Sequence, residues 1–253
     1  MAKNDWPGFK VATIEDYEKH RLIGASFGEP GSRKTSFWLE GPGPVAVFSL
    51  DQGLEGTVNR ELRRSPHKKI VVKEYEWYPQ KNVDLQQEAK DIVEQFMEDY
   101  EFAISHARTV VLDKENQFWQ LFRYAQFGPD ATDDMKNYDE VNQKFRRVVN
   151  MGKATDINIG FIDDMKDRWG TTKTGRQGPM GRMRAGFKEL DGLVHLTLEH
   201  SGHGQGDWSI RVGKIRGPGN PILADTELDF GACPTFKDFA MAMFPDSQEE
   251  VWD

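Results

Sequence analysis

Short apolar segments alternate with amphipathic segments along the first two thirds of the chain. Each apolar run ends in polar or glycine residues, which is typical of buried strands. These runs occupy residues 20–28, 44–51, 69–77, 109–113 and 157–163. Apolar residues at three-to-four spacing predict helices between them. These helices cover 84–106, 116–127 and 138–152. Strands that alternate with helices indicate an α/β fold with a mostly parallel central sheet.

The pattern changes in the last third of the chain. Residues 193–200 and 208–216 alternate apolar and polar positions, as an antiparallel pair of strands does. We therefore expect a mixed sheet, with antiparallel strands toward the C-terminus. A short final helix is expected after Pro234, with Thr235 as its N-cap.

Two segments give no helix or strand pattern. Residues 128–137 form an acidic stretch, which we interpret as a loop. Residues 166–186 are rich in glycine and strongly basic, and they predict a long loop or a hairpin. We divide the chain into an N-terminal segment 1–19, a core 20–217 and a C-terminal segment 218–253 that carries the short helix.

Composition narrows the class of protein. The 253 residues suffice for one main domain, and the formal net charge of −8 means that any nucleic-acid binding needs a local basic patch. The single cysteine, Cys233, excludes an internal disulfide. The chain has no run of 18 apolar residues and no apolar leader after Met1, so we expect a cytoplasmic protein without a membrane partner.

The sequence GEPGSRKTSF follows the first predicted strand directly and leads into a helical start. It has the outline of a phosphate-binding loop, G-x-x-x-x-G-K-[ST], in which backbone amides surround phosphates, lysine reaches them and a hydroxyl holds Mg²⁺. Arg33 stands where the motif has its second glycine. The alternative is a glycine turn followed by a chance Lys-Thr pair. The candidate nucleotide residues here are Gly28, Glu29, Pro30, Gly31, Ser32, Arg33, Lys34, Thr35 and Ser36.

A second element supports a nucleotide site. TVVLD ends in Asp113, and a carboxylate at the end of such a strand orients Mg²⁺ in phosphoryl-transfer proteins. Thr35 and Asp113 are thus the candidate magnesium ligands. Glu55 and Glu115 are candidates for orienting the attacking water, with Glu55 favoured because it follows a strand and a glycine turn. The alternative for each of these two glutamates is a solvated loop residue. Asp163 and Asp164 end another strand and are candidate supporting groups.

Several motifs in this order resemble one family. GEPGSRKTSF, FSLDQGLEGTV, TVVLD, RAGFKEL before LVHLTLEH, and RVGKIRG together resemble the RecA-like ATP-binding proteins of bacteriophages, including the Sak-type single-strand annealing ATPases. The resemblance covers about residues 20–217. It implies a RecA-like P-loop NTPase core that binds ATP and Mg²⁺ and acts in DNA recombination as an oligomer or filament.

The resemblance also implies roles for individual residues. Lys34, Thr35 and Asp113 match the phosphate and magnesium residues, and Glu55 matches the water-activating glutamate. Lys214 and Arg216 resemble a basic pair that enters the neighbouring subunit's site and stabilises transition-state charge in trans. Their alternative is an exposed basic face of an edge strand.

The basic segment fits the same family, whose members lead single-stranded DNA past loops in this region. Arginines and lysines would contact phosphates there, and an aromatic ring would stack on a base. The candidate DNA-binding residues are Arg168, Trp169, Lys173, Arg176, Arg182 and Arg184, with Lys188 nearby. The alternative is a solvated mobile loop. A single-strand DNA-binding protein is a further partner that the family implies.

Two departures from the family pattern keep other functions open. Arg33 replaces a glycine, and Lys114 follows Asp113 where a small hydroxyl residue is commoner. One alternative is a degenerate nucleotide-binding module that regulates assembly or partner binding without turnover. Another is a small-molecule P-loop kinase, although the chain shows no lid with an arginine cluster after Asp113.

Overall fold

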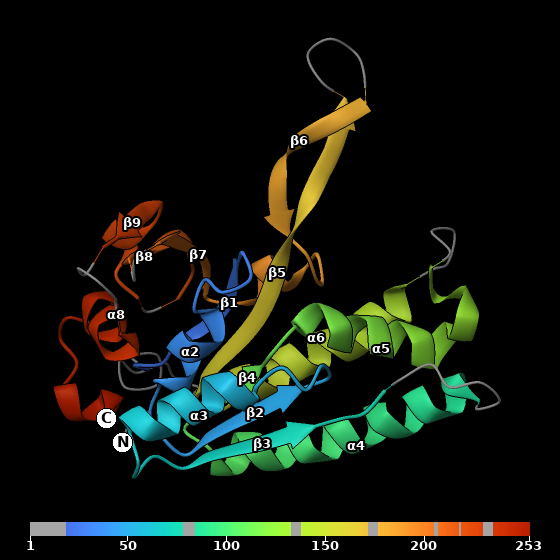
Figure 1. The fold of residues 1–253 in the computed structure, drawn as a ribbon, viewed down its shortest axis with the longest axis horizontal. Helices are drawn as coiled ribbons and strands as arrows, with labels where there is room; N and C mark the ends of the chain where they lie inside the picture. The colour runs from blue at the N-terminus through green and yellow to red at the C-terminus, as the bar shows by residue number, and fades with distance from the viewer. Residues whose placement is uncertain are drawn as a thin grey trace, which may run out of the picture.

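The computed structural model describes residues 19–77, 84–132, 138–171, 177–204, 207–217, 219–229 and 235–253. Over these ranges the chain folds around one twisted sheet with helices on both faces (Figure 1). The core strands are β1 (Ile23–Gly28), β2 (Val45–Ser49), β3 (Ile70–Glu74), β4 (Thr109–Leu112), β5 (Asn158–Thr171) and β7 (Leu196–Gly204). β6 (Gln177–Arg184), β8 (Asp207–Ile215) and β9 (Thr226–Leu228) complete the strands of the described residues.

The sheet has the order β3-β2-β4-β5-β1-β7-β8-β9. Each pair from β3 to β7 is parallel, and β8 and β9 add antiparallel strands. This confirms the expected α/β fold class, with a mostly parallel central sheet and antiparallel strands toward the C-terminus. Because β1 lies between β5 and β7, the loop that follows β1 is central at the carboxyl edge of the sheet.

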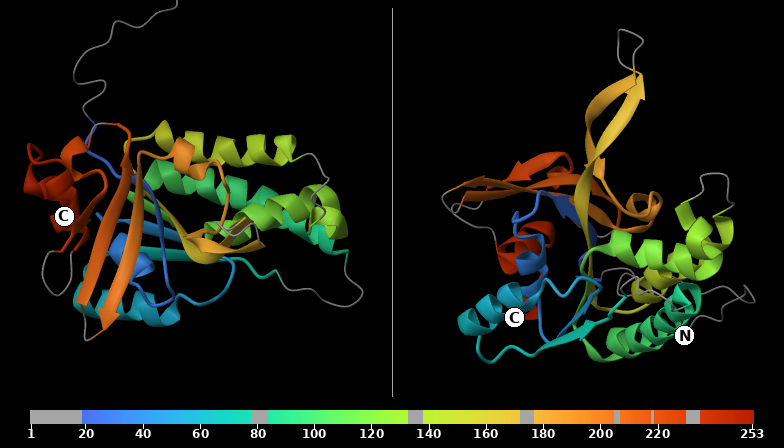
Figure 2. Two further views of the ribbon diagram at one scale, coloured as in Figure 1. Left: turned by 90° about the horizontal axis from the view of Figure 1, so that it is seen from above. Right: turned by 45° about the vertical axis from the view of Figure 1, so that its right-hand side comes forward.

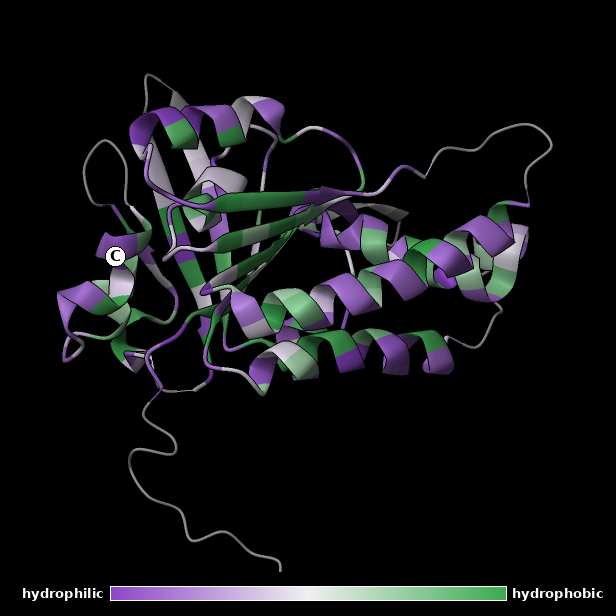
Figure 3. Cartoon of the chain, turned by 90° about the horizontal axis from the view of Figure 1, so that it is seen from below, coloured by the Kyte–Doolittle hydropathy of each residue, from purple (hydrophilic) through white to green (hydrophobic). Residues whose placement is uncertain are grey.

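Alternate residues of the strands enter two separate hydrophobic cores. In β2, Ala46 and Phe48 face one core, whereas Val45 and Val47 face the other. Residues buried on both faces are typical of strands in a parallel sheet covered by helices. Figure 3 shows the hydrophobic colouring along the central strands and the mixed colouring of the surrounding helices.

The two faces are covered by different helices. One core includes residues of α4 (Leu85–His106), α5 (Glu115–Phe127) and α6 (Asp139–Lys153), with Phe96 and Phe118 fully buried. The other includes α2 (Lys34–Leu39) and α8 (Phe236–Met243), where Phe37 and Phe236 pack with ring centroids 5.3 Å apart. These positions confirm the helices that apolar spacing predicted over 84–106, 116–127 and 138–152.

The ends of α8 also follow the sequence. Thr235 accepts a hydrogen bond from the Asp238 amide, and Asp238 accepts one from the Thr235 amide, which forms a capping box. Among the described residues, no helix is both long enough and apolar enough to cross a membrane.

Five short segments differ from the sequence expectations. Residues after β2 form a further helix, α3 (Glu55–Arg64). Most of its residues are charged or polar, so the sequence pattern did not indicate a helix. A short 3-10 helix (Gly128–Thr132) begins the stretch that we expected to be a loop. A one-turn helix, α7 (Leu190–Leu193), precedes β7, and two further 3-10 turns occupy Pro221–Leu223 and Glu249–Trp252.

The basic segment is a hairpin rather than an irregular loop. β5 continues well beyond the sheet and pairs with the antiparallel β6, from Met165 opposite Arg184 to Thr171 opposite Gln177. The hairpin stands clear of the helices in Figure 1 and in the right-hand view of Figure 2. Its base therefore lies at the carboxyl edge of the sheet, beside the loop after β1.

Candidate nucleotide site

The loop after β1 has the backbone of a P-loop. Gly28 is required by a close approach, since a Cβ there would lie 2.3 Å from the carbonyl oxygen of His200 on β7. Gly31 has φ of +79°, and a Cβ there would meet nothing within 4 Å, so the chain turns into open space. Pro30 is also exposed, whereas Ser32 and Ser36 are buried. The loop thus lies over the edge of the sheet with one side open.

Arg33 has a left-handed backbone conformation, which explains why the motif usually has glycine at this position. Its φ of 64° and ψ of 14° are left-handed, and it forms the N-cap of α2. Glycine adopts this region without cost, whereas for a residue with a Cβ it costs about 1–2 kcal/mol. The substitution therefore keeps the backbone path of the motif and adds local strain.

The side chain of Arg33 points away from the loop opening. Its guanidinium donates a hydrogen bond of 2.9 Å to Glu40, the C-cap of α2. It also lies 6.0 Å from the ring centroid of Trp208. Since phosphates bind at the start of the P-loop helix and Glu40 lies at its end, Arg33 does not fill the phosphate position.

Lys34, the expected phosphate-binding lysine, is buried at the start of α2. Its ammonium donates to the carbonyls of Gly28 at 2.7 Å and Glu29 at 3.0 Å, and it lies 3.4 Å from Asp164. Burial lowers the pKa of Lys34, and the neighbouring carboxylate of Asp164 opposes this shift. The ammonium is held by exchangeable loop carbonyls, so an incoming phosphate can replace them.

Thr35 and Asp113 lie together as expected for magnesium ligands. The Thr35 hydroxyl donates a hydrogen bond of 3.0 Å to the Asp113 carboxylate. Burial raises the pKa of Asp113 to about 6, and the hydrogen bond from Thr35 opposes that rise. A hydroxyl and a carboxylate beside a lysine are the oxygen ligands that fit a magnesium–phosphate group.

Asp51 is a member of the site that the sequence analysis missed. It follows β2 as Asp113 follows β4, and its carboxylate forms an ion pair with Lys114. Lys114 has φ of 59°, so its unusual position after Asp113 is also a left-handed one. Asp51 accepts hydrogen bonds from Ser49 at 2.9 Å and from the Gly53 amide at 3.1 Å. The signal that could have found Asp51 is its place after a strand at the same sheet edge.

A buried ionic cluster joins the site to the base of the hairpin. Arg184 of β6 bonds to Glu115 at 3.1 Å and to Asp163, and both carboxylates are fully buried. It also pairs with Asp191 at 2.8 Å. Burial, followed by the charge of Asp163, raises the pKa of Glu115. Gly186 closes the cluster, since a Cβ there would lie 2.1 Å from Glu115.

This cluster changes the roles that two residues were expected to have. Arg184 is 7% exposed and its guanidinium binds protein groups, so it does not lie on an exposed basic surface. Glu115 is fully buried and accepts from the Phe187 amide, so it is a structural partner of Arg184. Asp163 accepts from the Asn116 amide at 2.9 Å, which places it in the same support.

The other hairpin residues are more accessible. Arg168 and Trp169 are exposed, and Trp169 is 66% accessible to solvent. Arg182 forms an ion pair with Glu29 of the P-loop. Lys188 is exposed after the hairpin. The expected contacts of Lys173 and Arg176 lie outside the described residues.

Lys214 and Arg216 lie toward the amino ends of the parallel strands, whereas the P-loop lies at their carboxyl ends. Thr197, near the start of β7, pairs with Lys214, whereas His200 further along β7 pairs with Gly28. Lys214 bonds to the Asp191 carbonyl, and Arg216 donates to the Gly192 carbonyl at 3.1 Å. The pair is therefore remote from the P-loop of its own chain.

Glu55 begins α3 and its side chain is exposed. It lines a surface pocket together with Gln52 from the preceding turn, Leu62 of α3 and Glu74 of β3. No described contact joins its carboxylate to Lys34, Thr35 or Asp113. Its expected role in orienting water stays a prediction.

Three comparisons with known proteins bear on the class of this domain. A family model described as AAA_24, an AAA domain, matches residues 21–206, which is more than half of the chain. A solved structure of a KaiC-like protein from the hyperthermophilic archaeon Pyrococcus horikoshii OT3 is similar, with 10% identity, 84% of this chain and 86% of that chain covered, and a TM-score of 0.44. No curated protein matches the sequence. The chain belongs to the AAA_24 family of AAA domains.

Proposed function

We propose that the protein binds ATP with Mg²⁺ and hydrolyses it in response to single-stranded DNA, in phage recombination or single-strand annealing. The observation that carries this proposal is the double connection between hairpin and P-loop. Arg182 of β6 pairs with Glu29 of the loop, and Arg184 of the same strand binds the cluster beside Asp113. A ligand on the hairpin therefore acts on strands that touch the nucleotide site directly.

Each residue of the site has a separate role in the binding and hydrolysis of the nucleotide. Lys34 exchanges its loop carbonyls for phosphate oxygens, and Thr35 and Asp113 hold the metal through oxygen atoms. Bound Mg²⁺ supplies neutralisation of the phosphate charge. Glu55 orients the attacking water, because an exposed carboxylate at the start of α3 is free to turn toward the loop.

The exposed hairpin supplies the DNA contacts. Trp169 provides a ring on which a base stacks, and Arg168 beside it provides a charge for the backbone phosphates. Base stacking of this kind is sequence-tolerant because every base has a flat face. A hairpin that projects from the body offers such contacts without blocking the P-loop (Figure 1).

Turnover depends on assembly in this proposal. Lys214 and Arg216 are remote from their own P-loop, so they act on a neighbouring subunit in an oligomer or filament. A single-strand DNA-binding protein is a further proposed partner. Mixing a Lys34→Ala chain with a Lys214→Ala/Arg216→Ala chain tests the arrangement in trans. Recovery of activity in the mixture supports it, and two inactive chains that stay inactive together contradict it.

The central experiment measures phosphate release with and without single-stranded DNA. We expect DNA to raise the rate at least tenfold, and Trp169→Ala to remove most of that increase while the basal rate stays unchanged. Phe102→Ala is the matched control, since Phe102 is an aromatic residue of similar exposure, 63%, on α4. A rate that no nucleic acid changes would refute the DNA-dependent function.

A second candidate function is a nucleotide-binding module without turnover. The left-handed backbone of Arg33 favours it, as does the exposed position of Glu55, which has no described contact with Lys34, Thr35 or Asp113. It predicts that ATP binds and controls assembly while no phosphate is released under any condition. Equilibrium binding measured beside phosphate release separates the two functions.

A further inference from the structure

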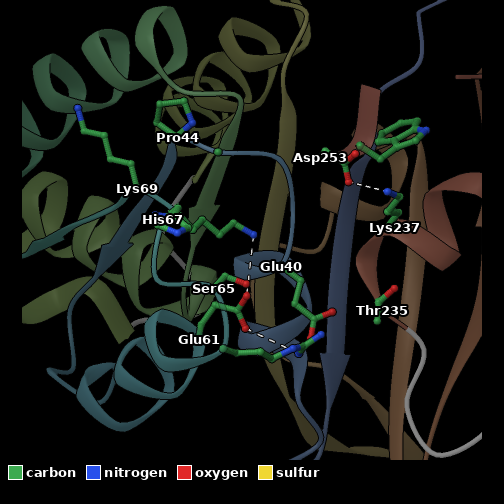
Figure 4. A pocket seen from close by; sticks show the side chains of 13 residues that line it. Glu40, Pro44, Glu61, Ser65, His67, Lys69, Thr235, Lys237 and Asp253 are labelled. Atoms are coloured by element: carbon green, nitrogen blue, oxygen red, sulfur yellow. Dashed lines mark hydrogen bonds and ion pairs between the residues drawn. The ribbon is translucent and has the colours of Figure 1, made fainter. Parts of the chain in front are cut away.

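A second cavity, of about 610 Å³, lies between the ends of α2 and α3 and the start of α8 (Figure 4). Its wall includes Pro44 and Lys69, which directly precede β2 and β3. The cavity is therefore at the amino ends of these strands, whereas Thr35 and Asp113 lie at the carboxyl edge. Its size is within the range of small-molecule sites.

One carboxylate in the wall is fully used by the protein. Glu40 is almost buried, and its Oε1 accepts from Arg33 at 2.9 Å and from Arg64 at 2.5 Å. Its Oε2 accepts from the Phe236 amide at 3.1 Å. Both oxygens of Glu40 therefore already have partners within the protein.

The second carboxylate in the wall, Glu61, forms only a long ion pair with Lys68. The Lys68 side chain is 13% exposed, and its nearest carboxylate oxygen is Glu61 Oε1 at 4.0 Å. Its ammonium makes no hydrogen bond with the part of the chain that the structure describes. Glu61 also lies 3.8 Å from Arg64. Three cations, Arg33, Arg64 and Lys68, thus face two carboxylates, Glu40 and Glu61.

The opposite wall adds another cation near the start of a helix. Lys237 pairs with Asp253 at 2.5 Å and Glu249 at 2.9 Å, and Thr235 beside it caps α8. Figure 4 shows Lys237 and Asp253 across the cavity from Glu40 and Glu61, and Lys69 extending away from both. The pairing of Lys237 is with exposed carboxylates, which a stronger anion can displace.

We propose that this cavity binds a phosphate-bearing anion through Lys68, with Arg64 and Lys237 on its two walls. A largely buried ammonium without a hydrogen bond gains most from an anion that supplies several acceptor oxygens. Phosphate meets this need, since its oxygens reach more than one cation at once. The site is separate from the P-loop, so it is a function beyond nucleotide binding there.

The test uses a protein that lacks the P-loop lysine and measures the anion binding that remains. Lys34→Ala protein is titrated with inorganic tripolyphosphate by calorimetry at low salt, and we expect one anion bound per chain. Lys68→Met in the same background should weaken binding at least tenfold. Lys90→Met is the matched control, because Lys90 is an exposed lysine on α4, and it should leave the affinity unchanged. Absence of binding to the Lys34→Ala protein would overturn the proposal, as would equal weakening by the two lysine substitutions.

Two further arms complete the experiment. Because Lys68 is largely buried, thermal melting accompanies each variant; if Lys68→Met does not fold, Lys237→Met replaces it, with several-fold weakening expected and an unchanged affinity counting against the site. ATP titrated in parallel identifies the source of the phosphate. Tighter binding of ATP indicates a nucleotide, and tighter binding of tripolyphosphate indicates an inorganic polyphosphate.

Discussion

The hydroxyl of Thr35 donates a 3.0 Å hydrogen bond to the carboxylate of Asp113, although 78 residues separate them in the sequence. The parallel sheet brings them together, since the P-loop follows β1 and Asp113 follows β4 at the same edge. This contact fits the proposed magnesium site, which takes one oxygen from the loop helix and one from a strand end.

Thr35→Val should separate magnesium binding from phosphate binding. The variant keeps the shape of the side chain and removes the hydroxyl, so ATP affinity in the presence of Mg²⁺ should fall at least tenfold while affinity in EDTA stays unchanged. Thr35→Ser should restore the Mg²⁺ dependence. Fluorescent-nucleotide titrations measure both conditions, and an equal loss with and without Mg²⁺ would speak against the assignment.

Glu55→Gln tests the proposed water-orienting role. We expect phosphate release to fall by about 10²-fold with ATP affinity retained, because general base catalysis contributes on this scale. Glu101→Gln on α4 is the control, since that glutamate is also exposed. Turnover that survives in Glu55→Gln would assign the water to another group, and Asp51→Asn would then be the next variant.

Arg184→Ala should be among the most destabilising single changes in the hairpin. It leaves Glu115 and Asp163 as buried carboxylates without their cation, and breaking such a cluster costs about 3–5 kcal/mol. Arg182→Ala removes an exposed pair and should cost about 1 kcal/mol or less. Urea unfolding of the two variants provides the comparison; similar losses would show that the cluster is not a structural support.

The sequence predicted the parts of this protein that depend on local pattern. Buried strands with apolar residues on both faces, the long helix at 84–106 and the Thr235 cap all follow from residue order alone. The α3 helix was missed because residues 55–64 are mostly charged or polar, and only Leu54, Val58 and Leu62 mark its apolar side.

The candidate site was predictable where a motif fixed it. Lys34, Thr35 and Asp113 lie together as their motifs indicated. The position of Arg184 was not predictable, because a basic residue in a basic segment gives no sign of two buried carboxylates from elsewhere in the chain. Asp51 was missed because its role arises from Lys114, a residue that itself departs from the pattern.

Stability should fall as the pH falls from 7 to 5 because of His200. Its imidazole is fully buried beside Phe37, and burial lowers its pKa to about 3 from the usual 6.5. Below pH 6.5 this histidine is protonated in the unfolded chain but stays neutral in the folded chain, so a falling pH favours unfolding. The free energy of unfolding therefore falls between pH 7 and pH 5. The loss is about 2 kcal/mol.

His200→Gln should remove the part of this pH dependence that His200 carries, about 2 kcal/mol between pH 7 and pH 5. The free energy of unfolding, measured in urea at pH 7 and pH 5, provides the readout. His67→Gln is the control, since that side chain is exposed and has water around it in both states. A variant whose stability falls as steeply as that of the unchanged protein would show that His200 does not carry the effect. His195, whose burial lowers its pKa to about 4, acts in the same direction and sets the residual slope.

Arg33 provides the most direct test of the claim that Gly28 to Thr35 is a working P-loop. Its backbone holds the glycine conformation and its guanidinium binds Glu40 at the far end of α2. The decisive measurement is the dissociation constant of Mg²⁺–ATP for the unchanged protein, Arg33→Gly and Lys34→Ala. We predict binding by the unchanged protein, an affinity for Arg33→Gly within about threefold of it, and at least a hundredfold loss for Lys34→Ala, on the scale of a buried charge-assisted contact. No binding by the unchanged protein, or a gain of a hundredfold in Arg33→Gly, would contradict the account.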